Sequence, residues 1–130
     1  MYKLRYVLFF SYLTFTIGSH ADNCVPYNCA EENPSHCSMT IYAPKGHKVK
    51  ITEATAKNGS AWQQEKIAEL LDIGKIYTVE RTIVDRSSTA VILSEVKDIR
   101  FNSVNFVDVC VLPENIKESH PDWIRYNAKK

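Results

Sequence analysis

The fold of this chain is decided by residues 74–109, which read GKIYTVERTIVDRSSTAVILSEVKDIRFNSVNFVDV. Apolar and polar residues alternate here with a period of two, interrupted at Arg81, and this alternation is typical of β-strands. We predict strands over 75–84, 89–96 and 101–112, the last being one long strand or two strands separated by a bulge. Short polar turns between them favour an antiparallel meander, which curls into a small partial barrel.

A strand and a helix are predicted before this stretch. Residues 48–52 alternate between polar and apolar, which indicates a further half-buried strand. Ser60 and Gln63 have the spacing of a capping box, and Gly74 has the place of a C-terminal cap, so a helix is expected over 61–72.

The predicted helix should cover the sheet with its apolar face, which we expect to consist of Trp62, Ile67, Leu70 and Leu71. We assign Trp62 and Phe106 to the hydrophobic core. The fold class that follows is α+β, with a small antiparallel sheet of meander or SH3-like form, one covering helix and an N-terminal arm held by disulfides.

The first 21 residues have the pattern of a secretory signal peptide, cleaved after Ala21. Lys3 and Arg5 precede an apolar run over 6–17, and small residues follow it. An uncleaved anchor is the alternative, but about twelve apolar residues are too few for a helix that needs ~20 to cross a membrane. We expect a secreted or periplasmic chain with no membrane span after cleavage.

The charge of the chain argues against nucleic-acid binding. The full sequence has 16 basic and 15 acidic residues; residues 1–21 contain two of the basic ones and no acidic one, so the mature chain has a net charge of −1. Its basic residues are scattered along the sequence, whereas nucleic-acid binding needs a concentrated positive surface.

All four cysteines lie after the predicted cleavage site, and an even number in a small exported chain indicates two disulfides. They are Cys24, Cys29, Cys37 and Cys110. Three pairings are possible, and each of them ties the cysteine-rich arm, residues 22–46, to the end of the β region. Zinc binding by the first three cysteines and His36 is the alternative, but four residues separate the first two cysteines and His36 adjoins Cys37, a poor spacing for one tetrahedral centre.

Two strand sequences resemble those of a group of proteins. The sequence GKIYTVERT over 74–82, together with FNSVNF over 101–106, resembles uncharacterised small bacterial and phage-borne proteins that share Gly-Lys-x-Tyr-Thr-Val and Phe-Asn-Ser-Val-x-Phe strands. The resemblance covers about residues 48–109 and implies a compact, mostly β, SH3-like domain. It brings no activity with it, and the signal peptide and the cysteine-rich arm depart from it.

No catalytic motif stands out in the sequence. His36, His47 and His120 could each act as a base, but no cysteine or serine is paired with them by a known spacing, and no serine lies in a Gly-x-Ser-x-Gly turn. The acidic residues fall in predicted turns or near strand ends, and Asn58-Gly59-Ser60, which also matches an N-glycosylation acceptor, is explained by a turn and a helix cap. We therefore predict no catalytic residue, no metal and no cofactor.

The aromatic residues outside the core point to binding. Tyr27 in the arm, with Trp123 and Tyr126 in the tail over 113–130, could form an exposed patch of the kind that anchors protein interfaces, or could cover the ends of the sheet as a second small core. With a β-rich domain over 47–112, these features predict an exported protein-binding module of the inhibitor or immunity type. The alternatives are a small secreted hydrolase whose site is assembled only in the fold, and a structural component of a surface or particle.

Overall fold

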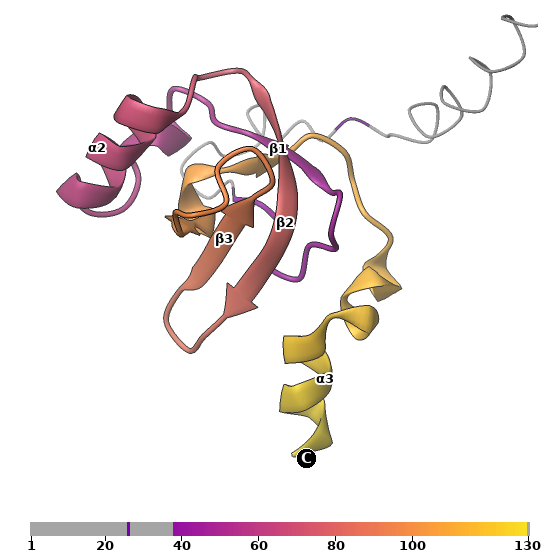
Figure 1. Cartoon of the computed structure of the whole chain (residues 1–130). Helices are drawn as coiled ribbons and strands as arrows, with labels where there is room; N and C mark the ends of the chain where they lie inside the picture. Colours follow the sequence, from indigo (N-terminus) through magenta and orange to yellow (C-terminus); the bar gives the residue numbers. More distant parts are fainter. Residues whose placement is uncertain (1–25, 27–37, 130) are drawn as a thin grey trace, which may run out of the picture.

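The computed structural model describes Pro26 and residues 38–129 (Figure 1). The predicted signal peptide, Tyr27, His36 and three of the four cysteines lie outside the described residues. The elements in chain order are β1 (Lys48–Lys50), the 3-10 turn η4 (Thr55–Lys57), α2 (Ala61–Leu70), β2 (Ile76–Val84), β3 (Thr89–Leu93), β4 (Phe101–Asn102), the 3-10 turn η5 (Ser103–Asn105), β5 (Val107–Asp108), the 3-10 turn η6 (Glu114–Ser119) and α3 (Pro121–Ala128).

The strands form one antiparallel sheet in the order β4-β3-β2-β1-β5. This confirms the α+β class and the meander of β2, β3 and β4. The predicted early strand is β1, which lies between β2 and β5 and pairs through Val49 with both Tyr77 and Asp108. The predicted strand over 101–112 is two strands of two residues each, separated by η5.

The sheet is curled, because β4 and β5 lie at its opposite edges although only residues 103–106 separate them in sequence. In a flat five-stranded sheet the two edges would be about 19 Å apart, at about 4.8 Å per strand. Three of the four connecting residues form η5, where the rise is only about 2 Å per residue. The connection is therefore too short for a flat sheet, and the two edges must approach each other.

A β-bulge in β2 explains why Arg81 interrupts the alternation of the sequence. Val79 pairs with Leu93, but Arg81 pairs with the next residue, Ile92, so Glu80 is an extra residue in the strand. After the bulge the buried positions shift by one residue, from Tyr77 and Val79 to Thr82 and Val84.

The helix α2 is confirmed in its position and in its capping box, but two details of the prediction were wrong. The amide of Ser60 donates to Gln63 Oε1 at 2.6 Å, and the amide of Gln63 donates to Ser60 Oγ at 3.2 Å. The helix ends at Leu70 and not at Asp72. Gly74 has a φ of 86° and lies in the turn that enters β2, where its amide donates to the carbonyl of Ile51.

The sequence had suggested that Trp62 is a core residue, but the structure shows that it is not. Its exposed fraction is 57%, whereas Ile67 and Leu71 of the same helix segment are buried. At 100° per residue, Trp62 lies roughly 140–180° around the helix axis from these two residues, so they cannot all face the sheet. Phe106, by contrast, is fully buried and confirms its assignment. The core around it comprises Met39, Ala43, Val49, Ile51, Ile67, Leu71, Tyr77, Val79, Val91, Leu93 and Phe101.

In the part of the chain that the structure describes, no helix is long and apolar enough to cross a membrane.

Candidate functional site

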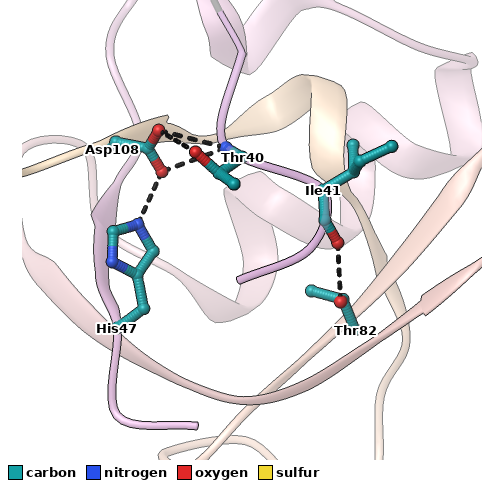
Figure 2. A network of polar contacts seen from close by, with 5 residues as sticks. All are labelled: Thr40, Ile41, His47, Thr82 and Asp108. Carbon is teal, nitrogen blue, oxygen red and sulfur yellow. Dashed lines mark hydrogen bonds and ion pairs between the residues drawn. The ribbon is translucent and has the colours of Figure 1, made fainter. Parts of the chain in front are cut away.

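A buried carboxylate, Asp108, joins the segment before β1 to an edge of the sheet (Figure 2). Both of its oxygens accept from the backbone amide of Thr40 at 3.1 Å, and one also accepts from the Thr40 hydroxyl at 2.7 Å. The other lies 2.6 Å from Nε2 of His47, a residue that is only 7% exposed. Asp108 thus collects three donors in a site from which water is largely excluded.

The direction of these bonds gives the cluster a structural role. The Thr40 hydroxyl donates to Asp108 and not to His47, so His47 is not placed to take a proton from it. A buried carboxylate that satisfies several donors is typical of a site that fixes the path of a chain segment. Here the segment around Thr40 is held against β5.

A second buried cluster is centred on His120 and lies at the start of α3. The Thr82 hydroxyl donates to the carbonyl of Ile41 at 2.7 Å, as Figure 2 shows, so its oxygen is left to accept from His120 Nε2 at 2.7 Å. His120 Nδ1 accepts from the backbone amide of Asp122 at 3.1 Å and thereby caps α3. These roles require a neutral imidazole with its proton on Nε2. The ring of Tyr42 packs edge-on against it at 5.4 Å between centroids.

Asp122 completes the attachment of α3 to the sheet. One of its oxygens accepts from the backbone amide of Val84 at 2.8 Å, and the other is 2.9 Å from the guanidinium of Arg125. His120 and Asp122 therefore fasten the first turn of α3 to β2 by two separate bonds.

The burial of His120 makes the stability of the protein sensitive to acid. Burial lowers the pKa of His120 below its usual value of 6.5, although the neighbouring Asp122 and a hydrogen bond to the backbone of Thr82 act in the opposite direction. The unfolded chain therefore binds a proton to this histidine more readily than the folded chain. We expect the contribution of His120 to be complete above about pH 6.5 and to be lost as the pH falls below that value. Urea denaturation between pH 7.5 and pH 5 measures this loss.

A matched variant isolates the histidine in that experiment. Asparagine can still cap a helix through its side-chain oxygen but does not titrate. His120→Asn should therefore show a smaller loss of stability between pH 7.5 and pH 5 than the unmodified protein. Equal losses of stability in the two proteins would show that His120 is not the source of the acid sensitivity.

A cleft of about 550 Å³ lies beside His120. It is lined by residues 42–45, by residues 80–83 of β2, by Arg100, and by residues 119–122 and Arg125 at the start of α3. The lining of this cleft thus includes four basic residues and two acidic ones, which are Lys45, Arg81, Arg100, Arg125, Glu80 and Asp122. Most of them come from segments that are distant in the sequence, and the fold alone brings them together.

The two acidic residues of the cleft are already neutralised. Asp122 is paired with Arg125, and Glu80 lies 3.2 Å from the ammonium group of Lys45. Glu80 also accepts from the Ser94 hydroxyl at 2.8 Å, and this bond, followed by the contact with Lys45, lowers the pKa of Glu80.

The groups that could perform catalysis in this cleft are engaged in structural bonds. Both ring nitrogens of His120 have partners, and the Ser119 hydroxyl donates to the carbonyl of Ile116. No set of three potential metal-ligating residues occurs within residues 38–129 or at Pro26. The chemistry that the cleft offers is the binding of a charged group by arginine side chains.

The other predicted site residues are placed as follows. Trp123 and Tyr126 both lie on α3 and are half-buried. Cys110 is not a free thiol, and its backbone forms an isolated antiparallel β-bridge with Pro26, which places Pro26 beside the end of β5. The predicted pairing of Cys110 with another cysteine, and any contact of Tyr27 with α3, fall outside the described residues.

Sequence reasoning missed Thr40, Thr82, Asp108 and Asp122. No motif connects these residues, because Thr40 and Asp108 are 68 positions apart and Thr82 and His120 are 38 apart. The one available signal was Asp108 itself, a carboxylate within the apolar run VNFVDVCV. An acidic residue inside a predicted buried strand is expected to have a specific partner.

Comparison with known proteins identifies a family that the chain matches. A family model described as bacteriophage T4 protein Y07B matches residues 47–122, from the histidine that contacts Asp108 to the aspartate that holds α3. No curated protein and no solved structure matches the chain significantly.

Proposed function

The chain belongs to the family of bacteriophage T4 protein Y07B, and we propose that it is an exported protein-binding module of the inhibitor or immunity type. The description of the family gives no activity, so the proposal is supported by the construction of the molecule. We further propose that its scaffold is an SH3-like partial barrel.

The connections of the sheet support the SH3-like scaffold. Three strands form a meander, a 3-10 turn follows, and the last strand, β5, returns to pair with β1. This arrangement gives a curled, partial barrel. Such a small curled sheet has little interior room for a substrate, because side chains fill it. Recognition then falls to the elements attached outside the barrel.

The observation that carries the proposal is the way α3 is attached. His120 and Asp122 bond the first turn of this helix to β2, and the rest of the helix extends away from the sheet (Figure 1). Ile124 is 51% exposed there, beside the half-buried Trp123 and Tyr126. Aromatic side chains on a firmly anchored helix are suited to act as anchors of a protein interface.

The N-terminal part of the chain supports an extracellular or periplasmic place of action. Residues 1–21 have the pattern of a signal peptide, and four cysteines follow them. The β-bridge between Cys110 and Pro26 supports this proposal, because it places one residue of the arm beside the domain. We propose that two disulfides fasten the arm in this way.

The aromatic residues of α3 are the first test of the proposal. A pulldown from the secreted or periplasmic fraction of the native cells should retain a specific protein on the unmodified chain, and the double variant Trp123→Ala, Tyr126→Ala should lose it. Removal of aromatic anchors commonly costs 2 kcal/mol or more, which is about a thirtyfold loss of affinity.

Trp62→Ala is the matched control, because Trp62 is also an exposed tryptophan on a helix but lies on α2. This variant should retain the partner. Equal retention by the unmodified chain, the double variant and Trp62→Ala would exclude α3 as the binding element.

Mass spectrometry of the chain recovered from the secreted or periplasmic fraction tests the proposed export and disulfides. A chain that still begins at Met1 would contradict the proposed cleavage, and four free thiols would contradict the proposed disulfides.

A further inference from the structure

We propose that the cleft beside His120 binds a carboxylate-rich segment of the partner protein. This inference rests on the proposed function and names the chemistry of the partner. It is carried by two arginines that the fold places on the same side of the sheet and that have no acidic partner among the described residues.

The register of the strands aligns these two arginines. Arg81 pairs with Ile92 across β2 and β3. Phe101 pairs with Val91, so the same antiparallel register places Arg100 opposite Ile92 from the other side. Residues directly opposite one another on neighbouring strands share a face of the sheet. Arg81, Ile92 and Arg100 therefore form a row across three strands, and both arginines line the cleft.

Ile92 shows how this row is built. It is only 8% exposed although its neighbours Val91 and Leu93 are the residues that face the core. Arginine side chains can cover apolar surface with their aliphatic stems while the guanidinium groups stay in water. Two arginines that flank an isoleucine are suited to this arrangement, which also limits the directions that their charged ends can take.

The charges of the cleft do not balance. Lys45 is paired with Glu80, and Arg125 is paired with Asp122. Arg81 and Arg100 are both exposed, and neither makes an ion pair with any residue that the structure describes. Their planar guanidinium groups are shaped to bind carboxylates through two parallel hydrogen bonds.

The remaining lining favours a peptide over a free inorganic anion. Pro44, Ile83 and Pro121 contribute apolar surface to the same cleft, and its volume of about 550 Å³ is much larger than a phosphate ion needs. A segment that alternates acidic and aliphatic side chains would use both the arginines and this apolar surface. Arg125 belongs to α3, so a partner that docks on α3 reaches the cleft directly.

Nucleic acid is the less favoured occupant. Arg81 and Arg100 form a local positive site on a chain whose net charge is close to zero and whose basic residues are scattered along the sequence, whereas a phosphate backbone requires a continuous basic surface. The test below therefore includes a nucleic acid among its probes.

The test measures binding of defined probes to the full mature chain by isothermal titration calorimetry. The probes are a synthetic peptide in which glutamate alternates with leucine, the same peptide with glutamine in place of glutamate, inorganic phosphate, and a single-stranded DNA oligonucleotide. We expect the glutamate peptide to bind most tightly and its affinity to fall several-fold between low salt and about 0.5 M salt.

Three variants locate that binding in the cleft. The double variant Arg81→Gln, Arg100→Gln keeps most of each side-chain stem and removes the charge, and it should weaken the glutamate peptide by about tenfold or more. Arg81→Lys, Arg100→Lys keeps the charge but removes the planar fork, so it should weaken the glutamate peptide by less than the glutamine double variant does. Arg86→Gln removes a charge from the exposed turn between β2 and β3 and should leave binding unchanged. Thermal unfolding of each variant shows whether it is folded.

Several results would overturn the inference. They are equal binding of the glutamate and glutamine peptides, binding of phosphate alone, tighter binding of DNA than of the glutamate peptide, or no effect of the glutamine double variant. If that variant does not fold, the comparison of the two peptides on the unmodified chain decides the question. A native partner that is retained by the glutamine double variant but lost by the α3 variant would refute this inference and leave the proposed function intact.

Discussion

Replacing Asp108 by alanine should lower the free energy of unfolding by about 3–5 kcal/mol, because the substitution leaves buried donors without an acceptor. The amide and hydroxyl of Thr40 and the Nε2 of His47 all lose their partner at once. For a domain whose total stability is about 5–15 kcal/mol, this is a loss of about a fifth or more. Urea denaturation followed by circular dichroism at pH 7.5 measures it.

Asp98→Ala is the control for this experiment. Asp98 is an exposed acidic residue near the end of the β3–β4 connection, and its removal should change the stability by less than about 0.5 kcal/mol. A loss below 1 kcal/mol for Asp108→Ala would mean that the Thr40 segment is not held by this carboxylate.

Replacing Phe106 by alanine should cost about 3–5 kcal/mol, since it removes a fully buried aromatic ring and leaves a cavity. The ring packs edge-on against Phe101, with 6.0 Å between centroids and 78° between planes. Phe106 immediately precedes β5, so the cavity would open where the two edges of the curled sheet approach each other. Thermal and urea unfolding measure the cost.

The same substitution at Trp62 is the contrasting case. Trp62 is larger than Phe106 but mostly exposed, and its only ring contact within the described residues is with the ammonium group of Lys66 at 5.8 Å from the centroid. Trp62→Ala should therefore cost less than about 1 kcal/mol. If the two substitutions cost the same, α2 packs on the sheet through Trp62 after all.

The local patterns of the sequence predicted local structure well. The alternation over 75–84 gave β2, and Ser60 with Gln63 gave the start of α2, because both signals depend on residues that are close in the chain. The helical face was misjudged, since Trp62 was grouped with Ile67 and Leu71 by its apolar character and not by its angle around the axis.

The segment FNSVNF was predicted as part of a strand, and the reason that it turns instead is a long-range contact. Asn105 is fully buried, and its side-chain amide donates to the carbonyls of Thr55 and Asn58 at 2.9 and 3.0 Å. A polar residue buried in this way holds η5 against the segment before α2. Alternation along one strand contains no information about a partner some 50 residues away.

The candidate site was the least predictable part for the same reason. His120 was identified in the sequence only as one of several histidines. Its role depends on Thr82, on the carbonyl of Ile41 and on the start of α3, which meet only in the fold. The row of Arg81 and Arg100 likewise depends on a bulge and a strand register that the sequence does not reveal.

The short connection between β4 and β5 also limits how a partner can bind. An open sheet exposes unpaired amides and carbonyls along its edges, and other chains can extend it by adding a strand there. Here both edge strands are two residues long, and η5 draws them toward each other. The backbone thus offers almost no template for strand addition, which protects the folded chain from joining to its own copies edge to edge. If the chain is the binding module proposed above, recognition falls to its side chains, and hence to surfaces that can discriminate between partners.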